Sequence, residues 1–185
     1  SELFDRAAEL FREGPQGYTQ NAGLPELREA IAQTFVHAGP NPDQIVVTCG
    51  SAGALSAALG SLVAHGRKVL IPDPAYPAYV DTVRFFGGVI QRVSLADADA
   101  QFIEGVEQAL DDDVQGLVIT HPVNPTGQVF SAETLKRLAA LSHAHRFWVV
   151  SDEVYRNHVD ENAPPSMHDI DNQAVVTGGL SKSLS

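Results

Sequence analysis

A lysine and an aspartate in this 185-residue sequence each follow an apolar run of strand length, and both kinds of side chain take part in catalysis in many enzymes. Lys182 lies in the small-residue segment Thr177–Ser183, directly after the run Ala174–Thr177. Burial and a neighbouring positive potential lower the pKa of such a lysine, so that its free amine attacks an aldehyde and forms an imine. Asp152 follows the run Phe147–Val150, where a buried carboxylate needs a partner such as a protonated ring nitrogen. Taken alone, a lysine in a loop is more often a solvated surface residue.

Three other loops follow apolar runs and supply groups suited to a small planar or anionic ligand. In Thr48–Ala54, small residues open a helix whose N-terminal N–H groups attract anions, although a tight strand-to-helix turn has the same pattern. The proline-rich loop Pro72–Tyr79 presents Tyr76, which either stacks on a planar ligand or plugs the loop. The loop His121–Gly127 holds Asn124, an amide donor that the neighbouring prolines keep in place.

The elements that must position these loops alternate along the chain between short β-rich runs and longer helical patterns. Six runs have the length of strands: Ile45–Thr48, Lys68–Ile71, Val89–Val93, Gly116–Thr120, Phe147–Ser151 and Ala174–Thr177. Helices are expected over residues 1–12, from Pro25 onward, and at Ala52–Ala64, Tyr79–Phe86, Phe102–Leu110 and Glu133–His145. This order predicts an α/β fold of three layers, α/β/α, with a mostly parallel central sheet. Because ligands bind beyond the carboxyl ends of parallel strands, the loops described above are expected to meet there.

Composition and charge narrow the classes of partner. A formal net charge of −11 argues against nucleic acid, whose backbone requires clustered Lys and Arg. The longest apolar runs are too short for a membrane span, and no signal peptide opens the sequence. The single cysteine, Cys49, excludes an internal disulfide framework and favours a cytoplasmic location. His143 and His145 lie two residues apart on an expected helix and point in different directions, so no metal site is expected.

In this order and spacing, the motif segments resemble those of the fold-type I pyridoxal-phosphate (PLP) enzymes, specifically the class I/II aminotransferases. The resemblance covers nearly the whole sequence through the following segments: Tyr18, Gly23–Ala32, Gly50–Ala54, Pro74–Pro77, Asn124–Gly127, Asp152–Tyr155 and Gly179–Lys182. It implies PLP as the cofactor and an amino acid and a 2-oxo acid as the substrates. The implied reaction transfers an amino group between these substrates through a Schiff base on Lys182.

The resemblance also implies a role for each side chain around the cofactor ring. Lys182 holds the cofactor and, once the substrate releases it, moves a proton between the substrate Cα and the cofactor C4′. Asp152 pairs with the pyridinium nitrogen and keeps it protonated. Tyr155, three residues after Asp152, and Asn124 hydrogen-bond the ring oxygen O3′. Tyr76 stacks on the face of the ring.

Phosphate binding and subunit contacts are implied in the same way. The backbone N–H groups of Ser51 and Ala52 cradle the phosphate. Tyr18 matches a tyrosine that reaches the phosphate of the neighbouring subunit, which implies a homodimer with shared active sites. Relatives often carry Ser or Thr where this sequence has Gly179, so one side-chain contact to the phosphate is missing. Arg28 also matches the family, and its place within a helix indicates a structural role.

The sequence is expected to comprise an N-terminal helix and loop, residues 1–17, and a PLP-binding large domain, residues 18–185, that is incomplete at its C-terminus. Relatives continue with a phosphate-binding arginine and a smaller domain that binds the substrate carboxylate, so a fragment of a larger enzyme is expected. The same residues would serve a PLP lyase, cyclase or synthase, or a non-catalytic aminotransferase-like regulatory domain. A nucleotide-binding domain is disfavoured, because Ser181 stands where a Walker A loop requires glycine.

Overall fold

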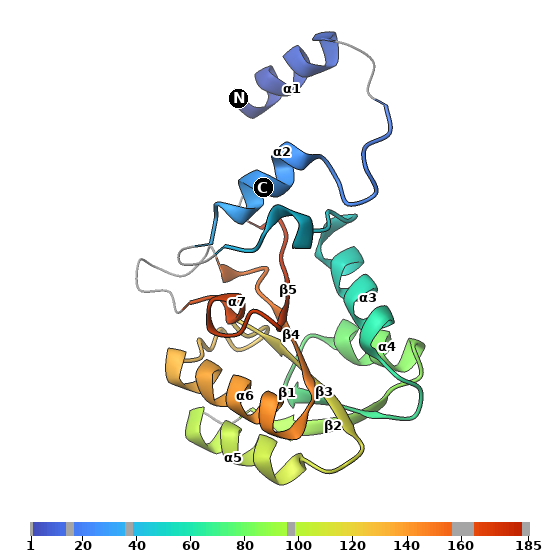
Figure 1. The fold of residues 1–185 in the computed structure, drawn as a ribbon. Helices are drawn as coiled ribbons and strands as arrows, with labels where there is room; N and C mark the ends of the chain where they lie inside the picture. Colours follow the sequence, from blue (N-terminus) through green and yellow to red (C-terminus); the bar gives the residue numbers. More distant parts are fainter. Residues whose placement is uncertain (1, 14–16, 36–38, 96–98, 157–164, 183–185) are drawn as a thin grey trace.

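The computed structural model describes residues 2–13, 17–35, 39–95, 99–156 and 165–182. Within them, five strands form one sheet in the order β2-β1-β3-β4-β5, and every neighbouring pair is parallel (Figure 1). The strands are β1 (Lys68–Asp73), β2 (Val89–Ser94), β3 (Val114–Thr120), β4 (Trp148–Asp152) and β5 (Val175–Thr177). The predicted parallel sheet is therefore confirmed.

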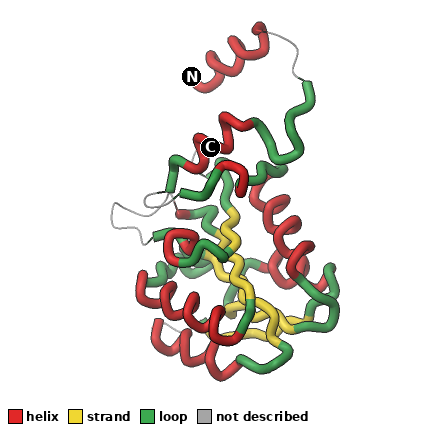
Figure 2. The backbone as a smooth tube through the Cα atoms, viewed as in Figure 1, coloured by secondary structure: helices red, strands yellow, loops and turns green. Residues whose placement is uncertain are grey.

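Helices cover both faces of this sheet (Figure 2). They are α3 (Gly50–Leu62) and α4 (Pro77–Phe85) on one face, and α5 (Asp99–Ala109), α6 (Ala132–His145) and α7 (Met167–Ile170) on the other. Successive residues of a strand point to opposite faces. Val118 accordingly packs with Leu59 of α3, whereas its neighbour Leu117 packs with Phe102 of α5 and Leu138 of α6. The expectation of three layers is confirmed, with two apolar clusters that are separated by the sheet.

The N-terminal helices α1 (Glu2–Glu13) and α2 (Pro25–Ala32) lie outside these layers, and α1 stands apart from the sheet (Figure 1). No residue of α1 is buried. In α2, Arg28 is buried, and its Nη1 donates to the Pro42 carbonyl at 3.0 Å and to Asp43 Oδ1 at 3.2 Å. Arg28 therefore ties α2 to the short 3-10 helix η1 (Pro42–Gln44), which is the structural role expected for it.

Two elements differ from the sequence-based prediction. The prediction of a strand at Ile45–Thr48 is wrong, because this segment is not part of the sheet. Apart from bonds in local turns, its only backbone hydrogen bond to the described residues joins the Val47 N–H to the Ala22 carbonyl at 2.9 Å. A β-rich run becomes a strand only beside a pairing partner, and none pairs with it among the described residues. Conversely, α7 has no counterpart among the expected helices. It begins with a capping box between Ser166 and Asp169.

Membrane-spanning helices and metal sites are both absent from the described part of the chain. No helix there is long and apolar enough to cross a membrane. Nor do three or more His, Cys, Asp or Glu side chains gather there in a group that could hold a metal ion. His143 Nε2 instead lies 3.1 Å from Asp171 Oδ2, a contact that joins α6 to the turn after α7.

Candidate functional site

The carboxyl ends of β3, β4 and β5 lie side by side, and backbone hydrogen bonds join the residues just beyond them. The N–H of His121 donates to the Asp152 carbonyl at 2.9 Å, and the N–H of Glu153 donates to the Thr177 carbonyl at 2.8 Å. Asp152 thus lies between the end of β3 and the end of β5. Because Thr177 is five residues before Lys182, the loop that carries the lysine starts directly beside Asp152.

The Asp152 carboxylate is buried among neutral donors, with 6% of the residue exposed. Its Oδ2 accepts from the Tyr79 hydroxyl at 2.8 Å, and its Oδ1 accepts from the Val154 N–H at 3.3 Å. Burial raises the pKa of Asp152, and the hydrogen bond from Tyr79 opposes that rise. Among the described residues, no Lys or Arg forms an ion pair with this carboxylate. It is therefore a buried acceptor suited to a cationic group of a ligand.

Tyr79 is a residue of this site to which the sequence analysis assigns no role. It lies in α4 with 1% of its surface exposed, and its hydroxyl accepts from Thr120 Oγ1 at 2.6 Å while it donates to Asp152. Burial raises the pKa of Tyr79 well above its ordinary value, and the charges of Asp152 and Tyr155 add to this, so the hydroxyl keeps its proton. Its ring meets that of Tyr76 edge-on, with centroids 5.6 Å apart. Tyr76 and Tyr79 are three residues apart at the start of a helix, and this spacing is the sequence feature that points to Tyr79.

Replacing Tyr79 with phenylalanine is expected to lower the free energy of unfolding of the full-length protein by about 1–3 kcal/mol, because two buried polar groups lose a partner. Urea unfolding followed by circular dichroism measures this change. Tyr76→Phe is the matched control, since Tyr76 is 45% exposed, and it should change the same quantity by less than about 0.5 kcal/mol. Equal losses in both variants would contradict a stabilising bond between Tyr79 and Asp152.

The turn at the start of α3 lies against the loop that carries Lys182. The helix begins at Gly50, whose φ of 71° favours glycine, and Ser51 and Ala52 follow in its first turn. N–H groups in a first helical turn have no partner within the helix and attract anions. A Cβ added at Gly179 would stand 3.4 Å from the Cβ and 3.7 Å from the backbone nitrogen of Ser51. The absence of a side chain at Gly179 thus leaves space beside that nitrogen, where an anion could approach.

The other predicted site residues differ in their exposure. Asn124 and Tyr155 are half-buried in turns that follow β3 and β4, and Tyr76 precedes α4. Lys182 is exposed in a turn, so the expectation that burial desolvates it is wrong for this chain. Leu180 and Ser181 beside it are exposed as well, so this turn lies at the surface of the part of the chain that the structure describes. Tyr18 is fully exposed in the segment before α2.

His121, which opens the Asn124 loop, is a buried neutral imidazole. It is 1% exposed, its ring stacks on Phe130 with centroids 5.8 Å apart, and its Nδ1 accepts from the Phe130 N–H at 3.3 Å. Burial lowers the pKa of His121 to about 4, with a smaller contribution from the charge of Arg156. His121 therefore supports the loop as a hydrogen-bond acceptor and carries no proton to donate from Nδ1 near neutral pH.

Comparison with known proteins finds relatives over nearly the whole chain. The family model described as aminotransferase class I and II matches residues 6–185. A Methanocaldococcus jannaschii protein described as a probable aspartate aminotransferase is 30% identical over 183 residues, which cover 97% of this chain and 49% of that protein. The aspartate/prephenate aminotransferase of Thermus thermophilus is 34% identical over 159 residues, which cover 83% of this chain and 41% of that protein. The chain thus spans about half the length of the curated relatives it matches.

Solved structures of aminotransferases share the fold described above. A mutant of Thermus thermophilus aspartate aminotransferase has a TM-score of 0.87 at 30% identity, over 96% of this chain and 51% of that chain. An Escherichia coli protein with a methionine aminotransferase function has a TM-score of 0.89 at 28% identity, over 98% of this chain and 50% of that chain. The family model includes every segment of the candidate site, from Tyr18 to Lys182. The chain therefore belongs to the aminotransferase class I and II family.

Proposed function

We propose that the full-length protein is a PLP-dependent aminotransferase that transfers an amino group between an amino acid and a 2-oxo acid. The observation that carries this proposal is the buried Asp152 carboxylate, which has neutral donors in Tyr79 and Val154 and no Lys or Arg partner among the described residues. A protonated ring nitrogen supplies the missing positive charge. The relatives reported above are named as aminotransferases, which favours transfer over a lyase, cyclase, synthase or regulatory role.

The residues at this edge of the sheet fit the chemical groups of PLP. The space beside Gly179 and the first turn of α3 suits its phosphate, and the partly exposed Tyr76 ring suits stacking on its ring. The residues that would hold the cofactor are Asp152 at the ring nitrogen, Asn124 and Tyr155 at O3′, Tyr76 on the ring face, Ser51 and Ala52 at the phosphate, and Lys182 at the aldehyde carbon.

The chain's own side chains then have defined tasks in the reaction. When bound, PLP supplies an electron sink for the negative charge that develops at the substrate Cα. Asp152 would hold a proton on the ring nitrogen, and the hydrogen bond from Tyr79 favours the ionised carboxylate against the effect of burial. Lys182 would hold the cofactor through its amine and, once the substrate had released it, would serve as the base that moves the proton at the substrate Cα.

The proposal extends to a cytoplasmic homodimer with shared active sites. The Tyr18 side chain is fully exposed, which supports a contact with the phosphate in a neighbouring subunit. The single cysteine, Cys49, is a free and exposed thiol, as is usual in a reducing compartment. The net charge of −11 disfavours nucleic acid as a partner.

Reconstitution of the full-length protein with PLP tests the proposed function. A visible absorption band of lysine-bound cofactor should appear, and borohydride should fix the cofactor on the peptide that contains Lys182. An amino acid without a 2-oxo acid should convert the band to that of the pyridoxamine form, and a 2-oxo acid should restore it. Fixation on another lysine would overturn the site. Loss of amine or CO2 without the pyridoxamine form would overturn the reaction.

A further inference from the structure

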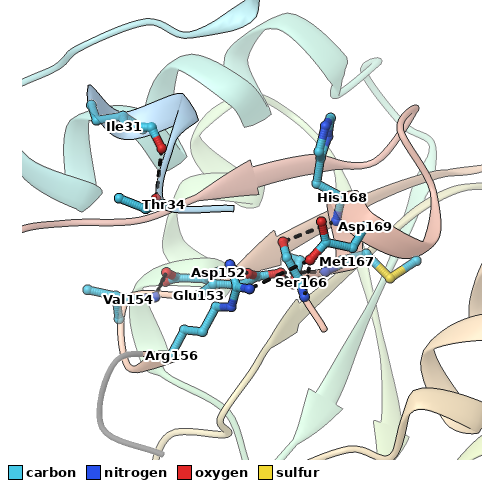
Figure 3. A network of polar contacts seen from close by, with 11 residues as sticks. Ile31, Thr34, Asp152, Glu153, Val154, Arg156, Ser166, Met167, His168 and Asp169 are labelled. Carbon is cyan, nitrogen blue, oxygen red and sulfur yellow. Dashed lines mark hydrogen bonds and ion pairs between the residues drawn. The ribbon is translucent and has the colours of Figure 1, made fainter. Parts of the chain in front are cut away.

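Next to Asp152, Glu153 carries a second buried carboxylate, for which the proposed function has no use. Its side chain is 3% exposed and faces α7, whereas Asp152 faces Tyr79 of α4 on the other side of the sheet. Glu153 Oε1 accepts from the Met167 N–H at 2.7 Å (Figure 3). The same oxygen accepts from the Ser151 hydroxyl at 3.2 Å. Its Oε2 is buried without a hydrogen-bond partner in the part of the chain described.

Glu153 contacts both ends of the segment Met167–Thr177, which comprises α7 and β5. Its side chain accepts from the N–H of Met167, the first residue of α7. Its backbone N–H donates to the carbonyl of Thr177, the last residue of β5, at 2.8 Å. The loop with Lys182 follows Thr177 directly. One residue therefore fixes the start and the end of the segment that leads to the lysine.

Charged neighbours reinforce this connection. Arg156, in the turn after β4, places Nη1 3.9 Å from Glu153 Oε2 and Nη2 3.6 Å from Asp169 Oδ2 of α7 (Figure 3). Its guanidinium carbon also lies 5.5 Å from the centre of the Phe35 ring. The Arg156 side chain is 17% exposed and the Asp169 side chain 1% exposed, so these charges are poorly screened by water. The turn after β4 and α7 are thus joined by charge as well as by hydrogen bonds.

Burying a carboxylate at this position carries a desolvation cost, which its hydrogen bonds must offset. Burial raises the pKa of Glu153, and the bond from the Met167 N–H opposes that rise. An apolar side chain of similar volume would fill the same space without the desolvation cost, but it would leave the Met167 N–H without an acceptor. Glu153 therefore provides a directed link between β4 and α7, which an apolar residue would not provide.

We infer that Glu153 is a positioning residue of the cofactor site, which sets the separation between Asp152 and the loop that carries Lys182. The inference rests on the proposed function, because these are the two residues that would hold the ring nitrogen and the aldehyde carbon of PLP. They belong to β4 and to the loop after β5, the two elements that Glu153 joins. A displacement of β5 along β4 would move the lysine amine relative to the ring.

Two conservative variants of the full-length holoenzyme test the inference. E153D keeps the charge, but its shorter side chain does not reach the Met167 N–H, whereas E153Q loses the charge and keeps the accepting oxygen. Circular dichroism in the visible band of bound PLP reports how the cofactor is oriented. We expect E153D to lose most of this dichroism signal. It should also lower kcat about tenfold with KM little changed, because a tenfold change corresponds to the loss of about one hydrogen bond. E153Q should keep both quantities within about twofold of the wild type.

D171A is the structural control, because Asp171 lies in the same segment but is paired with neither Glu153 nor Arg156. Its Oδ1 accepts the Gln173 N–H at 3.0 Å, and its Oδ2 lies 3.1 Å from His143 Nε2. This variant should lower the thermal unfolding temperature, as E153D does, while the visible dichroism and kcat remain those of the wild type. Wild-type dichroism and kcat in E153D, or equal losses in E153D and D171A, would overturn the inference and leave the proposed function intact. Absence of the band in the wild type would overturn the proposed function itself.

Discussion

Lys182→Ala is expected to eliminate the visible band of lysine-bound PLP and to lower kcat by about 10⁴-fold, at the upper end of what a positioned acid–base group contributes. The Lys182 amine would both attack the aldehyde and move the proton between the substrate Cα and the cofactor C4′, so one substitution removes two functions. Borohydride fixation followed by peptide mapping, together with the single-turnover rate for an amino acid donor, measures both losses.

Lys182→Arg separates the reactive amine from the positive charge. A guanidinium group stays protonated in proteins and does not form the imine, so this variant should lose activity as fully as the alanine variant. Lys136, exposed on α6, supplies the matched control, and K136A should retain the band and the rate. A cofactor still fixed covalently in K182A would contradict the assignment of Lys182.

Asp152→Asn is expected to have the second largest effect, because the amide keeps the shape of the carboxylate but removes its charge. Breaking a buried ion pair by removing one partner costs about 3–5 kcal/mol. If that cost falls on the reacting state, kcat decreases by about two to three and a half orders of magnitude. The decrease is expected because an amide would not hold the proton on the ring nitrogen, and steady-state kinetics with saturating PLP measure it.

The stability of the same variant should show that the loss of kcat does not come from unfolding. Burial raises the pKa of Asp152, so a neutral amide avoids a desolvation cost, and the cofactor-free D152N protein should unfold at or above the wild-type temperature. Asp73→Asn is the control at the end of β1, where an exposed ion pair with Arg92 contributes about 0–1 kcal/mol. It should leave kcat nearly unchanged. A D152N enzyme with wild-type kcat would contradict the role of Asp152.

The layers of the fold follow from local features of the sequence. A parallel strand is buried on both faces, so the stretches Gly116–Ile119 of β3 and Trp148–Val150 of β4 are apolar throughout and stand out from the helical patterns between them. Ile45–Thr48 has the same local character and is no strand. Whether such a run joins a sheet depends on a partner elsewhere, and no property of the run itself reveals that partner.

The same distinction applies to the candidate site. The sequence by itself determined that Lys182 and Asp152 stand at the ends of β-rich runs, because hydrophobic period and loop chemistry are local and can be read along the chain. Only the tertiary structure decided that Tyr79 meets Asp152 across 73 residues and that Glu153 meets Met167 across 14. Those contacts depend on strand order, register and the face toward which each side chain points, which arise only when separate elements pack together.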